Sequence, residues 1–118
     1  MTSLTDSADL PDLNVWLALA AAQHPHHAQA LHYWEKHASS QVLFCTVTAL
    51  GLTRLLSQPK LMGEAVMNSA EASALLLAFC KQPGVRMATL TIANGWRLVS
   101  FDRDFKRFEN LNWLQLSH

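Results

Sequence analysis

The fold prediction begins at Leu98-Val99-Ser100-Phe101-Asp102-Arg103-Asp104-Phe105. A short apolar run that ends at acidic residues is typical of a buried parallel strand at the point where it leaves the sheet. In open α/β sheets, ligands and metals bind at the carboxyl ends of strands. Asp102 and Asp104 are therefore candidate catalytic residues, with a solvated turn that carries idle charges as the alternative.

A second acid, Asp12, follows an ordered segment near the start of the chain. Pro11 lacks a backbone N–H, so the strand before Asp12 should be short or lie at an edge of the sheet. The run from Val15 to Ala22 is rich in Ala and Leu and predicts a helix, which Asp12 or Asn14 can cap. If the two strands are near neighbours, Asp12 and Asp102 converge on one cleft.

The composition is that of one small globular domain. The chain has 118 residues, of which 50% are hydrophobic and 15% are charged, and its formal net charge is +0. Any contact with a nucleic acid must therefore come from a local basic patch. Residues 1–9 are polar and predict a flexible N-terminal segment, and residues 10–118 a single domain.

The cysteines and the hydropathy pattern bear on the compartment. Cys45 and Cys80 lie in apolar runs and are expected to be buried thiols of a protein in a reducing compartment. No window approaches the apolar length of a membrane span, and residues 1–9 lack the basic region of a signal peptide. We therefore expect a cytoplasmic protein.

The remaining pattern alternates helices with strands. We predict a helix from Pro25 to about Ser39, a strand over Gln41–Cys45, a helix capped by Thr48 that ends at Ser57-Gln58-Pro59, a long helix over Gly63–Cys80, a short helix over Met87–Asn94 and a terminal strand around Trp113–Leu116. On the long helix, the predicted inward face is Val66, Met67, Ala70, Ser73, Ala74, Leu77 and Phe79. This order predicts a three-layer α/β/α domain with a central parallel sheet covered by helices.

Three histidines, His24, His26 and His27, surround Pro25. Their spacing does not place two ligands on one helical face, and no cysteine or carboxylate nearby completes a metal set. A turn and helix cap is the favoured interpretation.

Converging carboxylates repel one another and favour a cation between them. Mg²⁺ or Mn²⁺ binds through one or two carboxylates together with water and substrate phosphates. Such a metal polarises a phosphoryl oxygen and generates a nucleophilic hydroxide. The predicted metal ligands are Asp12 and Asp102, and none of the four glycines has the spacing of a phosphate-binding loop.

Four segments, taken in order, resemble the motifs of PIN domains of the kind found in VapC toxins. They are Asp12-Leu13-Asn14-Val15-Trp16-Leu17-Ala18-Leu19, His24-Pro25-His26-His27-Ala28 with Trp34, Thr48-Ala49-Leu50-Gly51-Leu52-Thr53-Arg54-Leu55-Leu56, and the stretch from Leu98 to Phe105. Together they cover most of the chain from Leu10 onward.

The resemblance implies a PIN-like α/β fold and a Mg²⁺- or Mn²⁺-dependent endoribonuclease, the toxin of a toxin–antitoxin pair. It also implies an RNA substrate, a cognate antitoxin and a homodimer. Carried over by position, Asp12 is the first metal-binding acid, and Asp102 lies across the cleft with Asp104 beside it. Thr48 and Arg54 match positions of the second motif.

The chain departs from the family pattern at two places. PIN domains usually carry another acid near the position of Ala49 or Gly51, and neither residue ligates a metal. They also have an aspartate at the start of the helix matched here to Met87–Asn94, which in register falls near Gly84. The connection there is shorter than in the family, so a segment between Pro83 and Met87 is either deleted or omitted.

Three functions follow as hypotheses. The first is a toxin-type ribonuclease, whose candidate substrate contacts are Asn14, Thr48, Arg54, Arg103, Lys106 and Arg107. The second is a catalytically impaired PIN-like module that acts through dimerisation or antitoxin binding, because acids of the family are missing. The third, ranked last, is a small-molecule phosphatase-like site built on Asp102 and Asp104.

Overall fold

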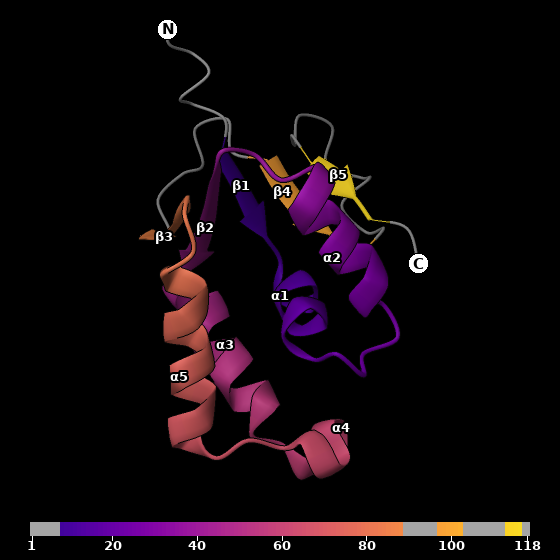
Figure 1. Ribbon diagram of the computed structural model, residues 1–118, viewed down its shortest axis with the longest axis vertical. Helices are drawn as coiled ribbons and strands as arrows, with labels where there is room; N and C mark the ends of the chain where they lie inside the picture. Colours follow the sequence, from indigo (N-terminus) through magenta and orange to yellow (C-terminus); the bar gives the residue numbers. More distant parts are fainter. Residues whose placement is uncertain (1–7, 89–96, 103–112, 117–118) are drawn as a thin grey trace, which may run out of the picture.

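The computed structural model describes residues 8–88, 97–102 and 113–116, in which helices follow each of the first two strands (Figure 1). The elements are β1 (Ala8–Pro11), α1 (Leu13–Ala20), α2 (His27–Lys36), β2 (Gln41–Cys45), α3 (Thr46–Leu56), α4 (Pro59–Met62), the 3₁₀ helix η2 (Gly63–Ala65), α5 (Ser69–Cys80), β3 (Val85–Ala88), β4 (Arg97–Ser100) and β5 (Trp113–Gln115). The predicted α/β class with a central parallel sheet covered by helices is confirmed. The predicted strands at 41–45 and near the C-terminus are also found.

The sheet has the strand order β3-β2-β1-β4-β5, and all neighbouring strands are parallel. β1 is short, as Pro11 predicts, but it is the middle strand and not an edge strand. Pairing with β2 involves only Ala8 and Asp9, so Pro11 lies beyond the last paired residue on that side. On the other side, the N–H of Asp12 donates to the carbonyl of Val99 at 2.8 Å and continues the ladder past Pro11. A proline at the end of a strand therefore removes no hydrogen bond that the sheet needs.

Helices α1, α2, α3 and α5 bury their side chains against one face of the sheet. The pairing register places Val42, Phe44, Val85 and Val99 on that face. Toward β2 and β3, Trp16 of α1 stacks on Phe44 with ring centroids 3.6 Å apart, and residues of α3 and α5 complete this cluster. Toward β4 and β5, a second cluster joins α1 and α2 to the sheet, consistent with the position of α2 in Figure 1. Helix α1 contributes to both clusters and so holds the two halves of the sheet together.

The ordered chain begins earlier than predicted. Ala8 and Asp9 belong to β1 and are buried, so the flexible segment predicted over residues 1–9 extends too far at its C-terminal end. Residues 1–7 lie outside the described part of the chain. Asp9 was placed in a loose segment because an acid among Ser, Thr and Asp residues resembles a solvated terminus.

The predicted cap of α3 is also corrected. The helix begins at Thr46, and its N-cap is Cys45, whose Sγ accepts a hydrogen bond from the backbone N–H of Thr48 at 3.4 Å. Thr48 lies inside the first turn, with its Oγ1 3.0 Å from the same sulfur. At the other end α3 stops at Leu56, as the Ser-Gln-Pro sequence predicts.

The long helix predicted over Gly63–Cys80 is wrong. Gly63 adopts a positive φ of 56° that ends α4, and α5 starts only after Asn68. Asn68 and Glu71 form a reciprocal capping box, a sequence signal for a helix start that the pattern of apolar residues concealed. The buried face changes with the new boundary: Ala72 is fully buried, whereas Leu77, predicted to point inward, is 60% exposed.

The short helix predicted over Met87–Asn94 starts in the wrong element. Met87 and Ala88 form the end of β3 and pair with Phe44 and Cys45 of β2. Residues 89–94 lie outside the described residues. Both cysteines are free, as predicted, but only Cys45 is buried; Cys80 is half-buried. In the described parts of the chain, every helix is too short or too polar to cross a membrane.

Candidate functional site

The strand order reverses between β1 and β4. Strands β1, β2 and β3 follow one another toward one edge of the sheet, while β4 and β5 extend toward the other. Such a switch point is where open α/β sheets bind ligands, at the carboxyl ends of the strands. Asp12 directly follows β1, and Asp102 comes two residues after β4. The two acids predicted to converge therefore follow adjacent strands at the same edge.

The hydroxyl of Ser100, a fully buried side chain, links the two acids. Its Oγ donates to Oδ2 of Asp12 at 3.0 Å and accepts the backbone N–H of Asp102 at 3.0 Å. It also accepts the side-chain amide of Asn14 at 3.2 Å. One donor and two acceptors are the full capacity of a hydroxyl group, so Ser100 is saturated. The sequence analysis assigned no role to Ser100, because a serine in an apolar strand carries no distinguishing signal.

Asp12 is the N-cap of α1, as predicted. Its Oδ1 accepts the backbone N–H of Leu13 at 2.7 Å, and the carboxylate lies at the positive end of the helix. Among the described residues each oxygen of Asp12 has one partner, which leaves a second acceptor position on each for a ligand. The side chain is held in place before anything binds.

Beside the acids lies an open hollow of about 520 Å³, lined by Asn14, His24, Pro25, His26, Phe101 and Asp102. The ring of His26 stacks on Phe101 with centroids 5.1 Å apart. The Nδ1 atom of His24 accepts the backbone N–H of His26 at 3.0 Å, so these histidines form the predicted turn, whereas His26, the N-cap residue of α2, makes no side-chain cap hydrogen bond. Burial, with help from neighbouring histidines, lowers the pKa of His24. This favours the neutral imidazole next to the hollow.

The described residues supply two acids to this edge. Asp104 and Arg103 lie outside the described residues, as do Lys106 and Arg107. Within residues 8–88, 97–102 and 113–116 there is no cluster of three or more His, Cys, Asp or Glu side chains fit to hold a metal ion. Two carboxylates nevertheless match what Mg²⁺ commonly takes from a protein when substrate phosphates and water complete its shell.

At the two positions where the resemblance to PIN domains predicts a further acid, small residues pack against neighbouring helices. Ala49 is buried, and a Cβ added to Gly51 would lie 3.0 Å from the side chain of Leu13. The alignment with the PIN-domain pattern that placed the missing aspartate near Gly84 is wrong. Gly84 precedes β3 and so lies at the opposite end of the sheet from Asp12, and a Cβ there would lie 2.5 Å from the carbonyl oxygen of Ser40.

Of the remaining residues predicted to contact substrate, one lies at the acidic site and two lie on α3. Asn14 lies at the site and bonds Ser100. Arg54 is exposed in the last turn of α3 and lines a separate hollow with Thr53 and Ser57. The hydroxyl of Thr48 lies within hydrogen-bonding distance of Cys45 Sγ, as described above.

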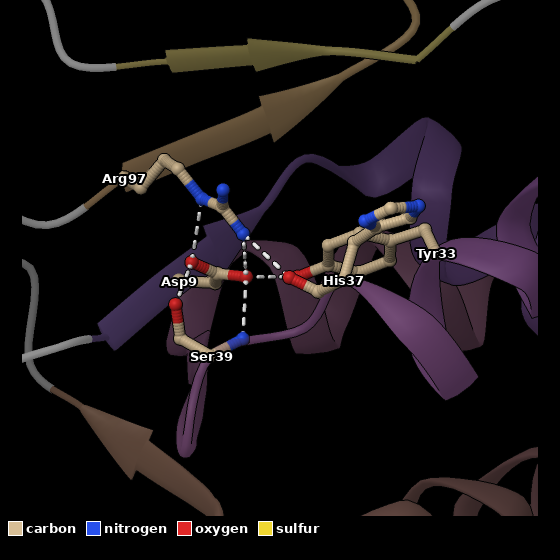
Figure 2. A network of polar contacts seen from close by, with 5 residues as sticks. All are labelled: Asp9, Tyr33, His37, Ser39 and Arg97. Atoms are coloured by element: carbon tan, nitrogen blue, oxygen red, sulfur yellow. Dashed lines mark hydrogen bonds and ion pairs between the residues drawn. The ribbon is translucent and has the colours of Figure 1, made fainter.

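A second polar centre is buried against the helix-covered face of the sheet (Figure 2). The Asp9 carboxylate, which is 0% exposed, pairs with the guanidinium of Arg97 through two bonds of 2.9 Å. It also accepts the hydroxyl of Tyr33 and both the N–H and the hydroxyl of Ser39, while Arg97 donates to the carbonyl of His37 at 2.8 Å. Side chains from β4 and α2 thus donate to one carboxylate of β1, so this centre is a structural clamp between β1, β4 and α2.

Electrostatics in the clamp follow from its burial and bonds. Burial raises the pKa of Asp9, but the hydrogen bonds from Arg97, Tyr33 and Ser39 outweigh it and hold that pKa below its ordinary value. Burial and the Asp9 carboxylate raise the pKa of Tyr33. At neutral pH the clamp therefore consists of a carboxylate, a guanidinium and a neutral phenol. The clamp is recognisable only when β1 and β4 are paired with Asp9 opposite Arg97, and the sequence alone does not determine that pairing.

At the level of fold, this chain is a PIN-like α/β domain. A comparison with solved structures finds VapC20 of Mycobacterium tuberculosis, described as a toxin that cleaves the sarcin-ricin loop, with a TM-score of 0.51 and 22% sequence identity. The alignment covers 73% of this chain and 58% of that protein, so the chain spans less than two thirds of its structural neighbour. No family model matches the sequence. No curated protein sequence matches it either.

Proposed function

We propose that this protein is a metal-dependent endoribonuclease of the VapC toxin type, whose site is formed by Asp12 and Asp102. The observation that carries the proposal is the Ser100 hydroxyl, which bonds Asp12 Oδ2 and the N–H of Asp102 at the switch point of the sheet. The fold shared with a toxin that cleaves the sarcin-ricin loop supports this choice of reaction class. Asp104, which follows Asp102 by two residues, is proposed as the third acid.

In this proposal the chain's residues bind and orient. Asp12 and Asp102 would hold a Mg²⁺ or Mn²⁺ ion, which when bound neutralises a phosphate oxygen and lowers the pKa of a water molecule. Asp12 is fixed by Leu13 and Ser100, so its free acceptor positions are pre-oriented. The hollow beside Asp102 would receive the RNA backbone, with Asn14 and Arg103 as candidate contacts.

The test is cleavage of RNA by the purified full-length chain with Mg²⁺, with Mn²⁺ and with EDTA. A ribosomal RNA fragment that carries the sarcin-ricin loop is the first substrate to try, because the structural neighbour cleaves it. We expect metal-dependent cleavage that is lost in Asp12→Asn and in Asp102→Asn. Glu64→Gln removes an equal charge from an exposed position and should leave the rate unchanged. Metal-independent cleavage, or full activity in Asp12→Asn, would refute the proposal.

The alternative is a catalytically impaired module that acts through dimerisation or antitoxin binding. One observation favours it: Val47 and Leu50 on α3 are 69% and 66% exposed, which leaves large apolar side chains available to a partner. Light scattering and magnesium calorimetry separate the two functions. A stable dimer with no heat of Mg²⁺ binding supports the alternative, whereas Mg²⁺ binding that Asp12→Asn removes supports the nuclease.

A further inference from the structure

Two histidines at the C-terminal end of α2 meet on the surface, away from the acidic site. His32 lies on the helix, and His37 is its C-cap residue. Their Nε2 atoms are 3.3 Å apart, and the ring planes cross at 67°. The sequence gives no signal for this pair, because a separation of five residues across a helix end matches no recognised motif.

The distance of 3.3 Å has a specific chemical meaning. A tetrahedral zinc ion with Zn–N bonds of about 2.0–2.1 Å separates two nitrogen ligands by about 3.3–3.4 Å. For an N–H···N hydrogen bond, by contrast, 3.3 Å is long. We propose that His32 and His37 form a binding site for a borderline divalent transition-metal ion, with Zn²⁺ as the best match to the geometry.

The two imidazoles are held close together by the backbone before any ion arrives. The N–H of His37 donates to the carbonyl of Tyr33 at 2.8 Å, and its own carbonyl accepts Arg97 at 2.8 Å. His32 is fixed on α2, one residue before Tyr33, whose hydroxyl is bonded to Asp9. Figure 2 shows His37 beside this clamp. Because the backbone of both histidines is fixed, binding an ion orders only side-chain torsions, which lowers its entropic cost.

The surroundings supply an outer-shell partner. His32 and His37 line a hollow of about 510 Å³ together with Gln29 and Gln115. The Oε1 atom of Gln29 is buried and has no hydrogen-bond partner in the described structure, although buried acceptors are usually satisfied. Metal-bound water is a strong donor, and outer-shell acceptors of this kind tune metal sites. Two imidazoles, water and an acceptor for that water make up the site.

His24 is less suited to the same task, because its Nδ1 accepts a backbone N–H, which leaves the proton of the neutral ring on Nε2. The proposed site also differs from the acidic site in ligand chemistry, since imidazole favours zinc, nickel and copper while carboxylates favour magnesium. Its test is therefore independent of the proposed nuclease.

The experiment is calorimetric titration of the untagged full-length chain with ZnCl₂ in a non-chelating buffer. We expect one Zn²⁺ per chain. Loss of an outer-shell partner typically weakens metal binding about 10- to 100-fold, and loss of a ligand should weaken it at least as much. We therefore expect His32→Ala and His37→Ala each to weaken Zn²⁺ binding by at least about 10-fold. His32→Cys, which provides a thiolate ligand, should restore binding. Both histidines are exposed, so circular dichroism should show folded variants.

The matched control is the double variant His24→Ala/His26→Ala, which removes two histidines and leaves the proposed ligands intact. It should bind Zn²⁺ like the unmodified chain. Gln29→Leu should weaken binding without abolishing it. Unchanged affinity in His32→Ala, or loss of binding in the control variant, would overturn the assignment and would indicate that the 3.3 Å contact is a hydrogen bond only.

Discussion

The substitution Asp9→Asn tests the buried clamp. The carboxylate accepts five hydrogen bonds, two from Arg97, two from Ser39 and one from Tyr33. Asparagine has the same shape, but one oxygen becomes an NH₂ donor. Oδ1 accepts two of these bonds and Oδ2 accepts three, and the hydroxyls of Ser39 and Tyr33 can rotate to accept instead of donating. The amide NH₂ therefore makes one donor–donor contact if it replaces Oδ1, with Arg97 Nε, and two if it replaces Oδ2, with Arg97 Nη2 and the N–H of Ser39. The change also leaves the guanidinium of Arg97 without its counter-charge.

The magnitude follows from burial. Removing one partner of a buried ion pair typically destabilises a protein by about 3–5 kcal/mol. The side chain of Arg97 is 28% exposed, and water therefore recovers part of its solvation. We expect Asp9→Asn to lower the free energy of unfolding by about 3 kcal/mol, at the lower end of that range. Urea unfolding followed by circular dichroism at pH 7 measures it.

Two control variants and the pH dependence sharpen this test. Tyr33→Phe removes a single bond and should destabilise by about 1 kcal/mol. The double variant Asp9→Leu/Arg97→Met removes both charges and should destabilise less than Asp9→Asn alone. Because the pKa of Asp9 lies below its ordinary value of 3.8, the carboxylate contributes stability above that pH and loses it as the pH falls through the folded-state pKa. The difference between the unmodified chain and Asp9→Asn should therefore shrink in acid. A loss below 1 kcal/mol at pH 7, or a difference that persists in acid, would refute the reasoning.

Three further predictions concern a helix cap, a turn and a histidine. Asn68→Ala removes the capping box of α5 and should lower the free energy of unfolding by about 1 kcal/mol in urea titrations; no change would mean that the cap is dispensable. Gly84→Ala places a Cβ 2.5 Å from the carbonyl oxygen of Ser40 at a φ of 84°, so we expect a loss of at least about 2 kcal/mol in the same assay, and a neutral result would contradict the turn geometry. Burial above all, and then His26, lowers the pKa of His24, so His24 binds fewer protons when folded and its contribution to stability falls as the pH drops below 6.5. An NMR titration of the His24 ring should give a midpoint below 6.5, and His24→Ala should reduce the loss of stability in acid.

The sequence predicted correctly those elements that depend only on residues close to one another in the chain. The strand at 41–45 was found because Val-Leu-Phe-Cys is apolar on both faces, and the α1 cap because Asp12 immediately precedes a helical run. The predicted strand ends at Asp12 and Asp102 were also right. Each of these features depends on a few neighbouring residues.

Features set by contacts between distant residues were missed. The apolar pattern of residues 63–80 continued through Gly63 and Asn68, and only the turn geometry and capping box divide it. Met87 was assigned to a helix because its pairing with Phe44 is not visible in the sequence. At the site, Ser100 gains its role from partners 86 and 88 residues away. Asp104 and Arg103 stay predictions.

The central position of β1 has a consequence for a chain that is still being synthesised. β1 can pair with β2 once Cys45 has emerged from the ribosome, but its other neighbour, β4, arrives only with Arg97. During that interval one edge of β1 is open, and the Asp9 carboxylate has no cationic partner. Because an unpaired charge resists dehydration, we expect it to hinder the unfinished half-sheet from collapsing or from pairing with another chain. The guanidinium that neutralises it arrives on the very strand that closes that edge.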